Sequence, residues 1–233
     1  FVAVSATDDP TGYENYTYTR DGSPAAVQMP TEPGEYELRY YVNQDRTIIA
    51  RQPIQVTAVG ATLDAPATAE AGSTVQVAWT GPDYRNDFVA VSATDDPTGY
   101  ENYTYTRDGT PAAVEMPTEP GTYELRYYVN QDRTIITRRE IVVTEVFASL
   151  DAPATASVDE TIQVGWQGPA YQNDFVAIGE PGDDSRYQDY AYARNGSPSS
   201  IQMPSEPGTY ELRYYLGQDR RILTRVAITV TAE

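Results

Sequence analysis

Short runs in which apolar and polar residues alternate recur along the whole chain. A period of two places every second side chain on the same face of an extended strand, so these runs predict strands with one buried face. No stretch shows the period of about 3.6 residues that marks an amphipathic helix, and we expect almost no helix. Between residues 60 and 146 the pattern predicts about seven strands, at 61–65, 73–79, 87–93, 102–107, 112–116, 122–129 and 134–144.

Turn-forming residues separate the predicted strands. Asp108 and Gly109 predict a type I′ hairpin, because both central residues of that turn need a positive φ. Pro120 and Gly121 mark the turn before the sixth predicted strand. Strands this short, with turns this frequent, are typical of an all-β sandwich.

The pattern returns at a fixed spacing of 87 residues, which holds without a gap to the end of the chain. Residues 1–59 match residues 88–146 at 51 of 59 positions. Residues 60–146 match residues 147–233 at 48 of 87 positions. We therefore expect tandem domains, with an incomplete repeat over 1–59 and complete repeats over 60–146 and 147–233.

The first repeat has no counterpart of residues 60–87, which carry the first two predicted strands. Without those strands a sandwich exposes an apolar face and unpaired backbone groups. Two sources for the strands stay open. They either precede Phe1 in a longer polypeptide or are donated by a neighbouring molecule.

Composition supports a folded β protein and argues against several functions. Twenty tyrosines and 40% hydrophobic residues supply enough apolar surface for a core. The formal net charge of −18 opposes binding to nucleic acids and anionic membranes, which need clustered cations. The chain has no cysteine and no histidine, so it lacks disulfides, thiolate sites and the commonest general base. No apolar run is long enough for a transmembrane helix, and we expect no membrane insertion.

Two segments resemble strands of immunoglobulin and fibronectin type III domains. In EPGTYELRYYV, Tyr123 has the place of the tyrosine corner, and Leu125 has that of the second cysteine of antibody domains. The segment VQVAWTGP is similar to a fibronectin-type strand B, which carries its tryptophan at the position of Trp79. The resemblance implies immunoglobulin-like sandwiches. We expect Trp79 and Trp166 to lie in their cores.

A narrower resemblance covers every repeat. The combination W-x-G-P, N-D-F-V-A, E-P-G-x-Y-E-L-R-Y and Q-D-R resembles repeats of bacterial proteins that carry a von Willebrand factor A domain, especially in marine alphaproteobacteria. That domain is not in this chain, and its metal-ion adhesion motif has no matching positions. The resemblance implies a scaffold at the cell surface, outside the cell or in the periplasm, and it supplies no active site.

The acidic loop between the third and fourth predicted strands is a candidate calcium site. Asp95, Asp96 and Glu101 offer carboxylates, and calcium takes six to eight oxygen ligands. The alternative is a solvated acidic turn. The third repeat replaces this loop with E-P-G-D-D-S-R, so any geometry differs there.

Two further places are candidates for ligand binding. Alternation puts Tyr103 and Tyr105 on one face, where their rings can stack on sugars or on another subunit. Asp132 and Arg133 lie in the expected turn between the last two strands, where binding modules often carry their specificity. The alternatives are tyrosines that cover a core with their hydroxyls in water, and an aspartate that caps its own turn while the arginine reaches a carboxylate.

No motif in the sequence predicts catalysis, since neither a phosphate-binding glycine loop nor a nucleophile elbow occurs. We expect a non-enzymatic extracellular or periplasmic stalk or scaffold, whose partners are other domains of the same polypeptide or neighbouring copies. Two alternatives stay open. One is an adhesive or carbohydrate-binding module that contacts surface glycans or proteins, and the other is a subunit of an extracellular filament joined by strand donation. Apart from calcium, no cofactor is expected.

Overall fold

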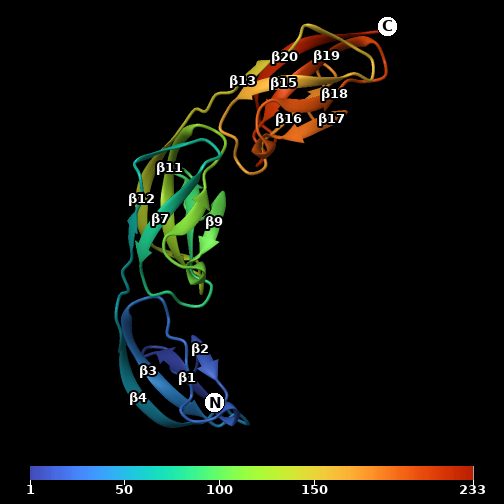
Figure 1. The fold of residues 1–233 in the computed structure, drawn as a ribbon. Helices are drawn as coiled ribbons and strands as arrows, with labels where there is room; N and C mark the ends of the chain where they lie inside the picture. The colour runs from blue at the N-terminus through green and yellow to red at the C-terminus, as the bar shows by residue number, and fades with distance from the viewer. Residues whose placement is uncertain (233) are drawn as a thin grey trace.

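The computed structural model describes residues 1–232, in which β-strands dominate. The strands form three groups that follow one another in a bowed row (Figure 1). The helical segments are single 3₁₀ turns at Thr19–Asp21, Thr106–Asp108 and Ala193–Asn195. Within residues 1–232, no helix is long and apolar enough to cross a membrane. The prediction of an all-β chain with almost no helix is confirmed.

The second group is a two-sheet sandwich. One sheet has the strand order β10-β7-β5, and the other has the order β6-β12-β11-β8-β9. Alternate residues of both sheets meet in a core that contains Val77, Leu125 and Ile141, all fully buried. The strands are β5 (Thr62–Asp64), β6 (Thr68–Glu70), β7 (Thr74–Thr80), β8 (Phe88–Ala93), β9 (Asn102–Tyr105), β10 (Ala112–Glu115), β11 (Gly121–Val129) and β12 (Thr134–Thr144).

The third group repeats this arrangement. Its sheets have the orders β13-β15-β18 and β14-β20-β19-β16-β17, and its core contains the buried residues Val164 and Leu212. The strands are β13 (Ser149–Asp151), β14 (Thr155–Ser157), β15 (Thr161–Gln167), β16 (Phe175–Gly179), β17 (Asp189–Tyr192), β18 (Ser199–Gln202), β19 (Gly208–Tyr215) and β20 (Ile222–Thr231).

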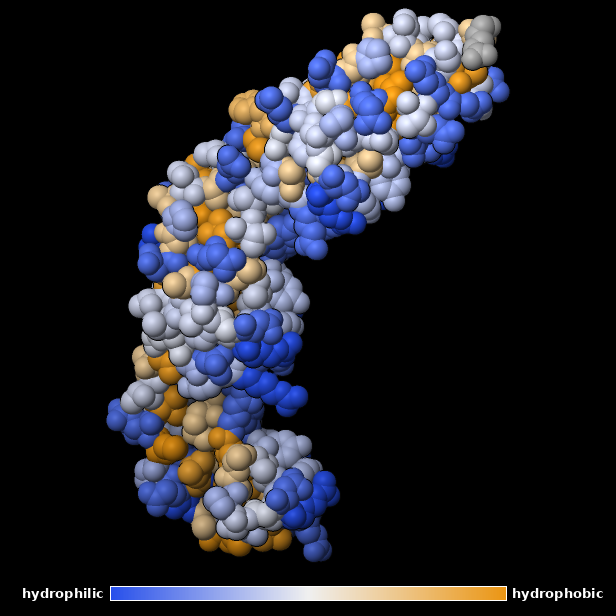
Figure 2. All heavy atoms as spheres, in the orientation of Figure 1, coloured by the Kyte–Doolittle hydropathy of each residue, from blue (hydrophilic) through white to orange (hydrophobic). Residues whose placement is uncertain are grey.

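The first group contains a single sheet, with the strand order β2-β1-β3-β4. Its strands are β1 (Val2–Ala6), β2 (Asn15–Thr17), β3 (Gly34–Tyr41) and β4 (Ile48–Val56). Residues 25–28, which correspond to β10, do not form a strand here. Tyr40 on the inner face of this sheet is 38% exposed, whereas the equivalent Tyr127 is 0% exposed. Figure 2 shows hydrophobic side chains at the surface of this group, at the lower end of the view.

Each complete group has eight strands, because the chain crosses between the sheets near its first strand. After β5 pairs with β7, the short strand β6 pairs in parallel with β12, with Thr68 opposite Val142. Pro66 lies between β5 and β6 and has no N–H with which to continue a ladder. Three residues are too few to show a period, so the sequence pattern did not predict β6.

The hairpin predicted at Asp108 and Gly109 is wrong. Thr106–Asp108 is a 3₁₀ turn, in which the Gly109 N–H donates to the Thr106 carbonyl at 2.9 Å. Of the two predicted turn residues only Gly109 has a positive φ, 108°. The flanking strands β9 and β10 belong to different sheets, so this segment carries the chain across the sandwich and does not reverse it within one sheet.

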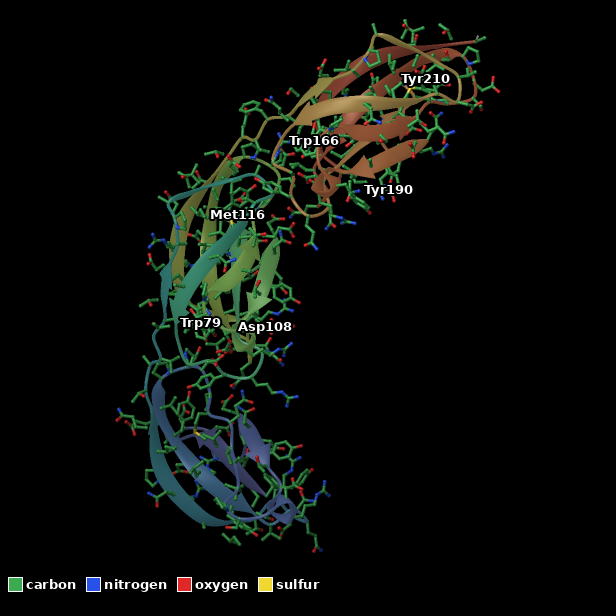
Figure 3. All side chains as sticks on the ribbon, viewed as in Figure 1. Trp79, Asp108, Met116, Trp166, Tyr190 and Tyr210 are labelled. Atoms are coloured by element: carbon green, nitrogen blue, oxygen red, sulfur yellow. The ribbon has the colours of Figure 1, made fainter. Side chains whose placement is uncertain are left out.

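The tyrosine corner is present in every group. The Tyr123 hydroxyl donates to the Glu119 carbonyl at 3.0 Å. Trp79 and Trp166 pack partly buried against the cores of their groups (Figure 3). The indole N–H of Trp79 donates to the Gly109 carbonyl at 3.1 Å. The equivalent corner bonds join Tyr36 to Glu32 at 3.1 Å and Tyr210 to Glu206 at 3.0 Å.

A second, smaller apolar cluster lies on the outer face of each larger sheet. In the second group the rings of Phe88 and Tyr128 stack with centroids 4.6 Å apart, and Tyr100, Tyr105 and Ile135 pack around them. Phe1 and Tyr41 stack in the same way at 4.8 Å. In the second group the acidic loop therefore contributes Tyr100 to this outer cluster.

Candidate functional site

The acidic loop of the second group is organised by its own backbone. One carboxylate oxygen of Asp96 accepts the N–H of Thr98 at 3.0 Å and that of Gly99 at 2.7 Å. These two hydrogen bonds hold the pKa of the Asp96 carboxyl below its usual range. A β-carbon added at Gly99 would lie 2.1 Å from an Asp96 carboxylate oxygen, so a larger residue there would displace the Asp96 side chain from this turn.

A buried guanidinium holds the loop from beneath. Arg126 is fully buried and donates to the carbonyls of Ala93 at 2.9 Å and Gly99 at 3.2 Å. Its Nε–H donates to the Glu124 carboxylate at 2.8 Å, and Arg138 donates to the same carboxylate at 2.6 Å. The carbonyls of Ala93 and Gly99 therefore already accept hydrogen bonds from arginine.

The structure does not assemble Asp95, Asp96 and Glu101 into one cluster. Within residues 1–232, no group of three or more acidic side chains is placed to hold a metal ion. Asp95 and Glu101 are exposed, while Asp96 is engaged by its own turn. Calcium binding at this loop thus gains no support from the geometry.

The structure brings Tyr103 and Tyr105 together, on the outer face of β9. Their ring centroids are 5.2 Å apart in an edge-to-face arrangement, and Tyr100 packs against Tyr103 at 5.2 Å. The Arg107 guanidinium lies 4.1 Å from the centroid of the Tyr105 ring. Tyr103 keeps 43% of its surface exposed, so the row both covers the outer cluster and faces solvent.

This tyrosine row recurs in the other two groups. Tyr16 and Tyr190 are 46% and 43% exposed, and β2, β9 and β17 all lie on the concave side of the bowed row (Figures 1 and 3). In the third group the alternate positions 104 and 106 change from threonine to Ala191 and Ala193, while both tyrosines and the arginine are kept. The residues on the outer face of the strand are thus the same in all three groups, whereas the residues between them differ.

Asp132 belongs to a joint between two groups. Its Oδ1 accepts the N–H of Thr134 at 3.1 Å and the Thr134 hydroxyl at 2.7 Å, so it caps its own turn as the alternative reading expected. Its Oδ2 accepts the hydroxyl of Thr31 from the preceding group. Burial alone would raise the pKa of the Asp132 carboxyl, but the bonds from Thr31 and Thr134 lower it. Arg133 is exposed and takes the left-handed position of the turn, with φ 60°.

The second joint repeats this contact and adds to it. The Thr118 hydroxyl donates to Asp219, and the Arg221 guanidinium donates to the Thr118 carbonyl. Arg221 also lies 3.7 Å from the Glu119 carboxylate. The Tyr171 hydroxyl donates to the Glu70 carboxylate at 3.2 Å across the same joint. The two joints therefore share one threonine–aspartate contact, and the second is more densely bonded.

A buried aspartate organises the loops at the end of each complete group that faces the preceding group. One Asp87 oxygen accepts the Tyr84 N–H at 2.9 Å and the Tyr127 hydroxyl at 3.2 Å, and the other accepts the Asn130 N–H at 3.0 Å. Burial raises the pKa of the equivalent Asp174. Hydrophobic alternation along the chain did not predict this role. The repeated N-D-F motif was its only signal, since it places an acid at the start of an otherwise apolar strand.

Comparisons with known proteins identify no family. No family model matches the sequence, and no curated protein matches it. Among solved structures, a biofilm-associated protein BSP domain is 12% identical over 73% of this chain, with a TM-score of 0.29. The chain spans 29% of that structure. The extracellular domains 3–5 of Drosophila OTK are 10% identical over 90% of this chain and 74% of theirs, with a TM-score of 0.25. Likeness at this level carries no inference about function.

Proposed function

We propose that the chain is a non-enzymatic stalk or scaffold that holds other domains at a set spacing, outside the cell or in the periplasm. The observation that carries the proposal is the joint itself. The contacts between Thr31 and Asp132 and between Thr118 and Asp219 use equivalent residues, so successive groups meet through one repeated contact. A binding or catalytic role would not require the same side chains at each joint.

Charge and sequence motifs support the proposed location. A net charge of −18 keeps such an array soluble and limits association between chains in a crowded exterior. The resemblance of the repeat motifs to those of bacterial von Willebrand factor A proteins supports a surface or secreted scaffold. On this proposal the partners are other domains of the same polypeptide or neighbouring copies, and the chain binds neither nucleic acid nor membrane.

Distance measurements between spin labels test the spacer role. The chain has no cysteine, so Gln76→Cys and Gln163→Cys, at equivalent exposed positions of β7 and β15, take labels selectively. We expect one narrow distance distribution across the second joint. Thr118→Val combined with Asp219→Ala should broaden it, because it removes the shared contact. A distribution that is equally broad before and after the substitutions would contradict the proposal.

Adhesion to glycans is the second candidate, and the repeated tyrosine rows favour it. Three rows with exposed rings on one side of the array could contact successive sugars of a polymer by stacking. On a glycan array, an adhesive chain should lose its signal when Tyr103 and Tyr105 become alanine. Tyr84→Ala, at an exposed tyrosine of the first joint, is the matched control and should keep it. Absence of any glycan signal would contradict the glycan-binding role.

A further inference from the structure

A cavity at the second joint has a carboxylate on each side. Its volume is about 290 Å³, and its lining includes Glu115 from the second group and Asp174 from the third. The two groups touch beside this cavity. A β-carbon at Gly72 would lie 3.4 Å from the Tyr171 ring and 3.7 Å from the Leu216 side chain. Docking of the two groups therefore brings Glu115 and Asp174 to the same confined space.

Asp174 supplies a charge that is buried in the third group itself. It is 1% exposed. Its carboxylate accepts the N–H of Gly217 at 2.9 Å, the N–H of Tyr171 at 2.9 Å and the hydroxyl of Tyr214 at 3.2 Å. Burial raises the pKa of Asp174, while these three bonds favour its charged form. Because all three donors belong to the third group, Asp174 keeps them whether or not the second group is docked.

Glu115 supplies the carboxylate on the other side, and it is specific to the second group. The equivalent residues of the first and third groups are Gln28 and Gln202. Burial in the joint, and after it the charge of Asp174, raise the pKa of the Glu115 carboxyl. The acid at this position is thus coupled to the neighbouring group, and the glutamines at the equivalent positions cannot be.

The second joint also lacks a cation that the first joint has. The cavity at the first joint is lined by Gln28 and Arg85, among others. The equivalents of these two residues are Glu115 and Gln172, and both line the cavity at the second joint. One difference adds a negative charge and the other removes a positive charge. Among the described residues that line the second cavity, none is basic.

The other charged groups at the second joint are engaged by different partners. Glu70 contacts Tyr171, Asp219 contacts Thr118, and Glu119 lies beside Arg221. Within the second group the neighbours of Glu115 are uncharged. Thr74 lies opposite it on β7, and the Asn102 amide donates to its backbone carbonyl at 3.0 Å. Glu101, next to Asn102 in the chain, is exposed. Asp174 is therefore the charge to which Glu115 responds.

We propose that Glu115 makes the second joint sensitive to pH, so that the two groups dock closely when it is protonated and separate more often when it is ionised. The proposal rests on the spacer role, since it concerns the regulation of one joint. The docked arrangement raises the pKa of Glu115 above its ordinary value of 4.5. Docking is therefore strongest below that value and weakens as the pH rises through the raised one.

Distance measurements at two pH values test the switch. With spin labels at Gln76→Cys and Gln163→Cys, we expect a narrow population at pH 5 and pH 7.5, and a broader one whose share rises about threefold at pH 7.5. In Glu115→Gln, which carries the residue of the other two repeats, that share should stay at its pH 5 value. Asp108→Asn removes a carboxylate at the opposite end of the second group (Figure 3) and should behave like the wild type. A share that pH does not change in the wild type, or changes equally in Glu115→Gln, would overturn the proposal.

Restoring the cation gives an independent test. Gln172→Arg places a guanidinium where Arg85 lies in the first joint, and it should hold the broader population at its pH 5 share at pH 7.5, because it neutralises the carboxylates. An NMR titration of the Glu115 carboxyl should give a raised pKa that returns toward 4.5 when Thr118→Val and Asp219→Ala loosen the joint. If Gln172→Arg responds to pH like the wild type, or loosening leaves the Glu115 pKa unchanged, the assignment is wrong.

The same measurements separate the switch from the spacer role. A distribution that is equally narrow at both pH values would overturn the switch and leave the spacer role intact. A distribution that is equally broad at both pH values, with and without Thr118→Val and Asp219→Ala, would contradict both.

Discussion

The first and second groups share 51 of 59 aligned residues. They differ in how deeply the residues on the inner face of the sheet are buried. The outer clusters are equivalent, since Arg39 and Arg126 are both fully buried and both donate to carbonyls of their loops. The inner faces are not, since Tyr40 is 38% exposed and Tyr127 is 0% exposed. The outer cluster is built from neighbouring strands and one loop, whereas the inner core needs a second sheet. Identical residues therefore have different surroundings.

Truncation of an inner-face leucine should separate the two groups most strongly. Leu125→Ala removes a fully buried side chain and should lower the free energy of unfolding of the second group by about 3 kcal/mol or more. Leu38→Ala, at the half-buried equivalent, should lower that of the first group by less than half as much. Urea titration followed by amide exchange in peptides from each group measures both. Equal losses would remove the distinction between the inner faces.

Replacement of the buried arginine should affect both groups alike. Arg126→Met removes the arginine donor of the Ala93 carbonyl and one of the two arginine donors of Glu124, and it should cost about 3 kcal/mol. Arg39→Met should cost a similar amount, because Arg39 makes the same bond to Glu37 at 2.9 Å. The same exchange experiment reports the outcome. If Arg39→Met does not change the stability of the first group, the two outer clusters are not equivalent.

The tyrosine corner should give a smaller effect. Tyr123→Phe removes one hydrogen bond to a backbone carbonyl and should lower stability by about 1 kcal/mol. Emission from Trp79 in a Trp166→Phe background reports the unfolding of the second group alone. Tyr36→Phe makes the corresponding test in the first group by amide exchange. The two losses should agree, because the corner is local to one sheet, and a loss confined to Tyr123 would contradict that.

Acid should weaken the acidic loops of both groups by a modest amount. The folded pKa values of Asp9 and Asp96 lie below their usual range because each carboxylate accepts two backbone N–H groups of its own turn. Their stabilisation is therefore present above the unfolded pKa near 4 and is lost as pH falls through the lower folded value. Urea midpoints at pH 7 and pH 3 should show the loss, and Asp96→Asn should reduce it in the second group. A pH dependence that Asp96→Asn leaves unchanged would assign it to other carboxylates.

The sequence predicted the strands well where one face is buried between sheets. Alternation located β8, β11 and β12, and the EPGTYEL pattern placed Tyr123 at its corner. Alternation also assigns Arg126 to the solvent side, and only the overlying loop hides it. The contacts of Thr118 with Asp219 join residues about a hundred positions apart. They depend on how whole groups dock, which no local period records.

Among the candidate sites, the sequence predicted contacts correctly only between residues of the same strand. Tyr103 and Tyr105 share a face as strand geometry requires. Asp132 does cap its turn, but its contact with Thr31 comes from another group. Composition predicts that the loop is acidic, but it does not show that a guanidinium lies beneath the loop.

Amide hydrogen exchange of the full chain tests most directly whether the first inner face is open. Strands β3 and β11 have equivalent sequences, and each is hydrogen-bonded on both sides, to β1 and β4 or to β8 and β12. Only the second sheet distinguishes their surroundings. We predict that amides of Gly34–Tyr41 exchange at least tenfold faster than those of Gly121–Val129. Equal protection of the two strands would contradict the account.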